Sequence, residues 1–107
     1  MPGHPSGMVT HIVFWRFLDE ANGQDREANL ARVSSALQAL PALIPEIETL
    51  EVGRDFNRSG AAFDLALYTR FASREHLATY QAHPEHQKVK DLVVAVVAET
   101  AVVDYES

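Results

Sequence analysis

The chain has 107 residues, a formal net charge of −6 at pH 7 and no cysteine. That length fits one domain with its own core, and the lack of cysteine excludes disulfides, thiolate catalysis and cysteine-based zinc sites. The acidic balance, without any cluster of lysine or arginine, argues against a nucleic-acid surface. Because no segment approaches the roughly 20 apolar residues of a membrane span, we expect a cytoplasmic protein that binds neither nucleic acid nor membrane.

Residues 1–7 are rich in proline and glycine, and we expect them to form a flexible leader before a single domain over residues 8–107. After them, "MVTHIVFWRFL" is dense in β-branched and aromatic residues, which predicts a strand that begins near Met8. Both faces of this strand are largely apolar, so we expect both to be covered. The alternation places one set of side chains on a common face: Val9, His11, Val13, Trp15 and Phe17.

The middle of the chain predicts a helix and two further strands. "DEANGQD" is a turn-rich break, and "REANLARVSSALQALPALI" then has the apolar spacing of an amphipathic helix that should end at Pro41. "EIETLEVGRDF" predicts a weak strand in which Gly53 marks a bulge. "FDLALYTRF" predicts a clearer strand, whose inward face carries five residues: Phe63, Leu65, Leu67, Thr69 and Phe71.

The last third predicts two helices that meet at a proline, followed by a strand. Ser73 has the character of a helix N-cap. Because proline disfavours helical geometry in the preceding residue and suits the first position of a helix, we expect one helix to stop near His83 and another to begin at Pro84. His83 is then an end-capping or surface residue, and "TAVVDYE" supplies the final strand.

The predicted order is strand, helix, strand, strand, helix, strand. Two βαβ-like halves of this kind give an α+β, ferredoxin-like fold, in which a four-stranded antiparallel sheet has its helices on one face. The other face must meet something, and packing against a second copy of the chain would form a dimeric α+β barrel. We therefore expect a homodimer through the open sheet face, which carries four partly apolar positions: Ile12, Phe14, Ala66 and Tyr68.

Three stretches of this sequence resemble the stress-responsive dimeric α/β barrel (Dabb) domain family: "HIVFWRF", "FDLALYTRFASREHLATY" and "HPEHQKV". They occur in the family's order and spacing, and the resemblance covers the chain from Val9 to Tyr105. It implies the dimeric α+β barrel fold, within a superfamily that includes polyketide cyclases of the olivetolic acid type. Those cyclases close a poly-β-keto chain by an aldol condensation without any cofactor.

The resemblance to the cyclases also implies a site. Their base histidine falls on His86, its partner tyrosine on Tyr80, and the histidine that opens the first strand on His11. Their pocket lies between sheet and helices, which implies that it is lined here by Val13, Trp15 and Leu67 as well. Trp15 is bulkier than the aliphatic residue that the cyclases carry at this position, which puts a long acyl substrate in doubt.

The residue types suit proton transfer, since a histidine that titrates near pH 6.5 can take a proton from carbon and a tyrosine hydroxyl can stabilise the resulting oxyanion. A purely structural alternative is that Tyr80 packs against its helix, while His86 bonds backbone groups that the break at Pro84 leaves free. A metal site is not expected, because HPEH is broken by proline where zinc enzymes need two ligands one helical turn apart.

Three functions remain open from the sequence. The first is a cofactor-independent enzyme of cyclase or lyase type, with His86 as general base, Tyr80 as hydrogen-bond donor and His11 orienting a small hydrophobic or polyketide-like carbonyl ligand. The second is a non-catalytic small-ligand-binding or stress-associated stability protein. The third is a cofactor-free monooxygenase. None of them requires a cofactor.

Overall fold

The computed structural model describes residues 7–107, so the predicted leader lies outside the described residues except for Gly7. Four antiparallel strands form one sheet in the order β4-β5-β1-β6, and β2 and β3 form a separate small hairpin. In chain order the elements are β1 (Val9–Phe17), β2 (Glu20–Ala21), β3 (Gln24–Asp25), α1 (Arg26–Gln38), a 3₁₀ turn (Leu40–Ala42), β4 (Thr49–Arg54), β5 (Leu65–Phe71), α2 (Arg74–Ala82), α3 (Pro84–Val94) and β6 (Val97–Glu106).

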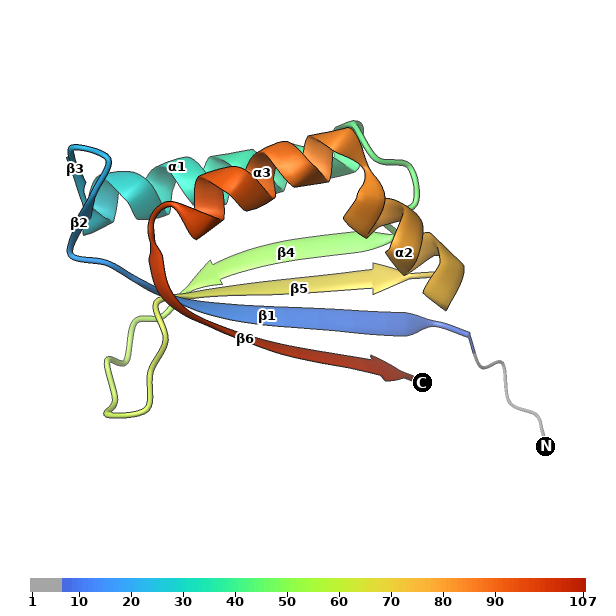
Figure 1. Cartoon of the computed structure of the whole chain (residues 1–107). Helices are drawn as coiled ribbons and strands as arrows, with labels where there is room; N and C mark the ends of the chain where they lie inside the picture. Colours follow the sequence, from blue (N-terminus) through green and yellow to red (C-terminus); the bar gives the residue numbers. More distant parts are fainter. Residues whose placement is uncertain (1–6) are drawn as a thin grey trace.

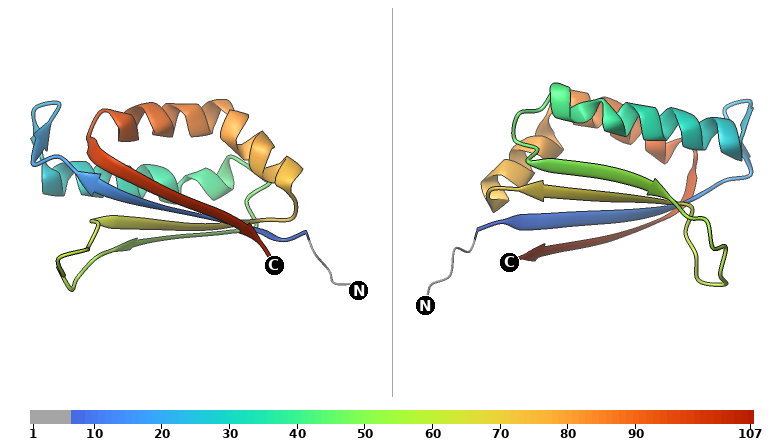
Figure 2. Two further views of the ribbon diagram at one scale, coloured as in Figure 1. Left: turned by 60° about the horizontal axis from the view of Figure 1, so that its bottom comes forward. Right: turned by 180° about the vertical axis from the view of Figure 1, so that it is seen from behind.

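The helices all lie on one face of the sheet (Figure 1). Seen from below and from behind, the opposite face carries no helix formed by residues 7–107 (Figure 2). This two-layer arrangement confirms the expected ferredoxin-like α+β fold with a four-stranded antiparallel sheet. No helix within residues 7–107 is both long and apolar enough to cross a bilayer.

The core lies between the sheet and the helices. Strand β5 alternates between buried and half-buried positions over its whole length, as its sequence pattern predicts. In β1 the predicted inward face is buried, and its residues pack against apolar side chains of α1 such as Val33 and Leu37. Burial of these side chains is the main favourable term in holding the two layers together.

The helix boundaries follow from caps that the sequence indicated. Ser73 accepts a hydrogen bond from the backbone N–H of His76 and so caps α2, as predicted. His83 is the residue at which α2 ends and α3 begins, and Pro84 is the first residue of α3. The imidazole of His83 accepts a hydrogen bond from the backbone N–H of Glu85, so its predicted capping role is confirmed.

Two expectations were wrong in detail and a third was incomplete. Gly53 marks no bulge, because it pairs with Ala66 in an unbroken ladder between β4 and β5. The register shift lies instead between Arg16 and Phe17 in β1, against β6. The turn-rich break before α1 forms the β2–β3 hairpin, and β6 begins at Val97, earlier than predicted. Pairing partners decide these features, and the sequence of one strand does not identify its partners.

The face without helices exposes large apolar side chains. Phe14 of β1 is 38% exposed, and Val103 and Tyr105 of β6 are 55% and 46% exposed. Successive residues of a strand point to opposite faces of the sheet, and residues paired across a ladder point to the same face. The pairing of β1 with β5 and β6 therefore places all three side chains on the face without helices. Ala66 and Tyr68, which were also predicted here, are half-buried within β5.

Candidate functional site

A cavity of about 530 Å³ lies between the sheet and α3. This volume is within the range of small-molecule sites. Strands β1, β5 and β6 and all three α-helices contribute to its wall, which is mostly apolar. The lining residues are His11, Val13, Trp15, Leu37, Leu67, Tyr80, Gln81, His86, Val89, Lys90, Val93, Val94, Thr100 and Val102.

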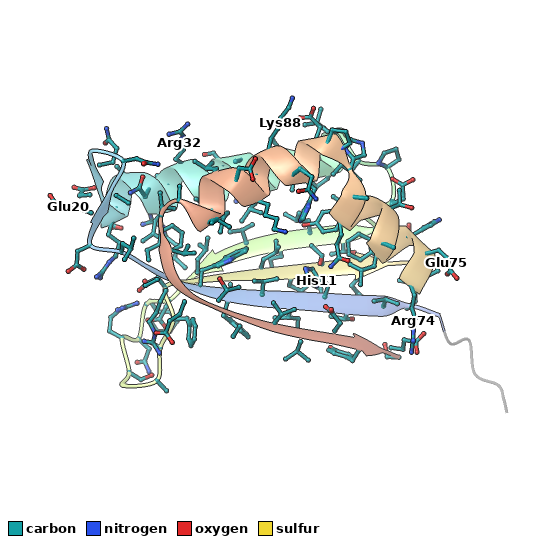
Figure 3. All side chains as sticks on the ribbon, viewed as in Figure 1. His11, Glu20, Arg32, Arg74, Glu75 and Lys88 are labelled. Atoms are coloured by element: carbon teal, nitrogen blue, oxygen red, sulfur yellow. The ribbon has the colours of Figure 1, made fainter. Side chains whose placement is uncertain are left out.

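Three polar side chains from different elements converge on this cavity. The ring centroid of Tyr80, from α2, lies 4.5 Å from that of His86 in α3 and 6.2 Å from that of His11 in β1. Tyr80 is thus the central ring of a group of three. Figure 3 shows His11 on the side of β1 that faces the helices.

The α2–α3 junction positions His86. Nδ1 of His86 lies 3.1 Å from the backbone carbonyl of Gln81, a carbonyl that would accept from the N–H of Glu85 in an unbroken helix. That N–H is turned to His83 instead. Since a carbonyl can only accept, Nδ1 carries the proton, and in the neutral ring Nε2 is the basic nitrogen.

Burial favours the neutral form of His86. Removal of the ring from solvent lowers the pKa of His86 below its usual value of 6.5, and the positive charges of neighbouring histidines and of Lys90 lower it further. The bond to the Gln81 carbonyl acts in the opposite direction and does not outweigh burial. His86 is therefore a free base at neutral pH.

Tyr80 is almost fully buried, with 1% of its surface exposed. Its ring packs on Phe71, with centroids 4.9 Å apart. Burial raises the pKa of Tyr80 to about 12, so the phenol keeps its proton. No residue within the described part of the chain forms a hydrogen bond with the Tyr80 hydroxyl. That hydroxyl is a donor available to a ligand.

His11 has a carboxylate partner that the sequence did not indicate. Its Nδ1 donates to the side chain of Asp104 on β6, and the two residues are directly opposite in the ladder between β1 and β6. His11 is buried, whereas the Asp104 side chain is 42% exposed. The carboxylate fixes the orientation of the ring and leaves Nε2 as the nitrogen that can meet a ligand.

All six residues predicted for the site line this one cavity: His11, Val13, Trp15, Leu67, Tyr80 and His86. Trp15 therefore forms part of the wall and does not fill the interior. Sequence reasoning missed Asp104, as well as the remaining wall positions of α3 and β6 and the contributions of Leu37 and Gln81. The α3 positions follow His86 at helical spacing, a signal that was present in the sequence. Asp104 could be found only once β6 was paired with β1 in the correct register.

A second cavity of about 420 Å³ lies at the α1 end of the sheet. Its wall is mainly charged, with five carboxylates and three guanidinium groups, and each of these guanidinium groups forms an ion pair. The pairs are Arg26 with Asp19, Arg54 with Glu27, and Arg58 with both Asp55 and Asp64. Because the arginines of this wall are already paired, the more apolar cavity beneath α3 is the better candidate for a ligand site.

The sequence model of the stress-responsive A/B barrel domain matches residues 9–107 of the chain. A stress-response A/B barrel domain-containing protein of Arabidopsis thaliana is 30% identical over 104 residues. The match covers 94% of this chain and 37% of that relative, so the chain spans only about a third of its length.

Solved structures share the fold over nearly the whole chain. A dimeric protein of unknown function and ferredoxin-like fold from Bacteroides fragilis is 34% identical, with a TM-score of 0.80 over 94% of this chain and 97% of its own. A hydroxynitrile lyase from Passiflora edulis also has a TM-score of 0.80, with 94% of each chain covered. Its identity is 17%, so that likeness concerns the fold alone.

Proposed function

Because the chain belongs to the stress-responsive A/B barrel domain family, we propose that it is a cofactor-independent enzyme of cyclase or lyase type. Its substrate is a small hydrophobic or polyketide-like carbonyl compound that binds beneath α3. One observation carries this proposal: the His86 ring lies beside a buried phenol in a mostly apolar cavity, and neither Nε2 of that ring nor the phenol hydroxyl has a hydrogen-bond partner within residues 7–107.

The proposed reaction begins with proton removal from carbon. Nε2 of His86 takes a proton from the carbon next to a carbonyl, the C–H electron pair moves into the new C–C double bond, and the carbonyl oxygen becomes an oxyanion. The Tyr80 hydroxyl donates a hydrogen bond to that oxygen, and an apolar wall strengthens this interaction by excluding water. His11, oriented by Asp104, accepts a hydrogen bond from a hydroxyl group of the ligand.

The nucleophilic carbon formed in this way can attack a second carbonyl of the same substrate, which is the cyclase form of the reaction. The reverse process, cleavage next to a hydroxyl-bearing carbon, is the lyase form. The hydroxynitrile lyase from Passiflora edulis is a precedent for lyase chemistry on a similar fold.

Proton exchange tests the first step without knowledge of the natural substrate. A hydrophobic aryl alkyl ketone in D₂O, followed by NMR, should exchange its α-protons faster with the protein than in buffer. His86→Ala should remove this acceleration while the folded state persists. If the variant remains as active as the original chain, His86 is not the base.

A second candidate function is a non-catalytic small-ligand-binding or stability protein. One observation favours it: the side chains of His86 and Gln87 both donate to the carbonyl of Gln81, so they satisfy a backbone group that the break at Pro84 leaves open. On this account His86→Ala lowers the free energy of unfolding by roughly 1–3 kcal/mol, as the loss of a partly buried hydrogen bond does. No ketone would then exchange its protons faster with the protein.

We further propose that the chain forms a homodimer through the face of the sheet that has no helices. The similar proteins from Bacteroides fragilis and Thermobifida fusca are described as dimeric. Exposed Phe14, Val103 and Tyr105 give this face the apolar character that a sheet-to-sheet interface requires. The proposed active site lies on the opposite side of the sheet, so each copy would have its own cavity.

A further inference from the structure

One face of α3 presents a continuous stripe to the cavity. The stripe consists of His86, Val89, Lys90, Val93 and Val94, which follow the helical spacing of one face. His86 and Lys90 are one turn apart, so their side chains start about 5–6 Å from each other. The positive charge of Lys90 lowers the pKa of His86, which is consistent with this proximity.

Lys90 is the only permanently charged side chain in the cavity wall, and no aspartate or glutamate of the described chain is part of that wall. Among the ion pairs within residues 7–107, none includes Lys90. Lys88, by contrast, pairs with Glu85 at 3.0 Å. Figure 3 shows Lys88 on the side of α3 that faces away from the sheet.

Lys90 is itself exposed and lies at the outer side of the cavity, together with apolar residues. Val94 is 65% exposed and Val102 is 52% exposed, whereas Val13 and Leu67 are buried in the sheet. The cavity therefore has an apolar interior and an opening with one ammonium group that forms no ion pair within residues 7–107. A ligand with an apolar body and a negative head group matches both parts.

We propose that Lys90 binds the anionic head group of an amphiphilic ligand whose apolar body fills the cavity. This deepens the proposed function, since it rests on the same site and names its ligand class. The net charge of the chain is −6, so the overall field disfavours anions. A preference for an anion must therefore come from a local group, and Lys90 is the one that the wall supplies.

Trp15 provides a direct readout, because it lines the cavity and is the single tryptophan of the chain. Octanoate and octanamide, which have the same length and differ in charge, can be titrated at neutral pH by Trp15 fluorescence and by calorimetry. We expect octanoate to bind at least about fivefold more tightly at low salt, the scale of one exposed ion pair with a charge-assisted hydrogen bond. The preference should shrink as salt screens the charges. Octyl phosphate, measured in parallel, identifies whether carboxylate or phosphate is the preferred anion.

Lys90→Met keeps the apolar stem of the side chain and removes its charge. It should abolish the preference for the anion and leave octanamide affinity unchanged. Lys88→Met is the matched control, since it removes the same charge from the outer side of α3 and should keep the preference. Equal binding of the two ligands, or an equal effect of both variants, would overturn the proposal. Absence of any binding would overturn this proposal and leave the proposed function to the ketone-exchange test, whereas a Lys90-dependent preference without proton exchange would overturn only the proposed function.

Discussion

The Asp104 carboxylate on β6 accepts a hydrogen bond from Nδ1 of His11 on β1, its direct partner in the ladder. The pair gives a buried imidazole a fixed orientation toward the cavity. Asp104→Ala should therefore slow proton exchange by about tenfold, because the ring loses the group that orients it. The free energy of unfolding should fall by no more than about 1 kcal/mol, since the carboxylate is 42% exposed.

Glu106→Ala is the control for this experiment. Glu106 is on the same strand and pairs with Arg74 at 2.6 Å, and it is not part of the cavity wall. The control variant should exchange ketone protons at the original rate. If both variants slow the reaction equally, the effect belongs to β6 as a whole and not to the orientation of His11.

Tyr80→Phe separates a catalytic hydroxyl from a structural one. Because the hydroxyl has no hydrogen-bond partner among residues 7–107, its removal should change the free energy of unfolding by less than about 0.5 kcal/mol. The exchange rate should fall by about 10²–10³-fold, as for the loss of one oxyanion donor. Chemical denaturation and NMR exchange measure the two quantities. A variant that is destabilised yet fully active would show that the hydroxyl is structural and not catalytic.

The pH dependence follows from the direction of the His86 shift. Burial lowers the pKa of His86 below 6.5, so the exchange rate should rise with pH, with a midpoint below 6.5, and then remain level. Tyr80 does not limit the upper range, since its pKa is raised to about 12. A midpoint above 6.5 in the pH–rate profile would mean that another group is the base.

The same shift affects stability. The unfolded chain binds a proton at His86 more readily than the folded chain does, so protonation favours unfolding. The contribution of this residue is complete above pH 6.5 and is lost as the pH falls from 6.5 through the lower pKa of the folded state. Unfolding measured across this range should show a pH slope that is smaller in His86→Ala.

The proposed dimer can be tested at an exposed strand position. Val103→Asp puts a charge on the open face at a side chain that is 55% exposed, so the single chain should tolerate it. If this face joins two copies, burial of the unpaired charge should produce monomers in light scattering. Arg32→Asp, on the outer side of α1 (Figure 3), is the control and should leave the assembly unchanged. A dimeric Val103 variant would exclude this face as the interface.

The sequence predicted the fold well because the alternation in β1 and β5, the cap at Ser73 and the helix start at Pro84 act locally. Six of the residues that line the cavity were also predicted, through the family resemblance and strand alternation. Asp104 escaped prediction because its role depends on pairing between strands at opposite ends of the chain. The bond from His86 to Gln81 was foreseen only as a structural alternative, yet the same ring also lines the cavity. The His86 side chain can therefore have both the structural role and the catalytic role.

His86→Asn tests the central claim most directly, because it separates these two roles. The asparagine amide can donate to the Gln81 carbonyl as Nδ1 does, but it offers no basic nitrogen in place of Nε2. We predict a free energy of unfolding within about 0.5 kcal/mol of the original chain and a proton-exchange rate lower by at least about 10²-fold. An exchange rate equal to that of the original chain would contradict the assignment of His86 as the base.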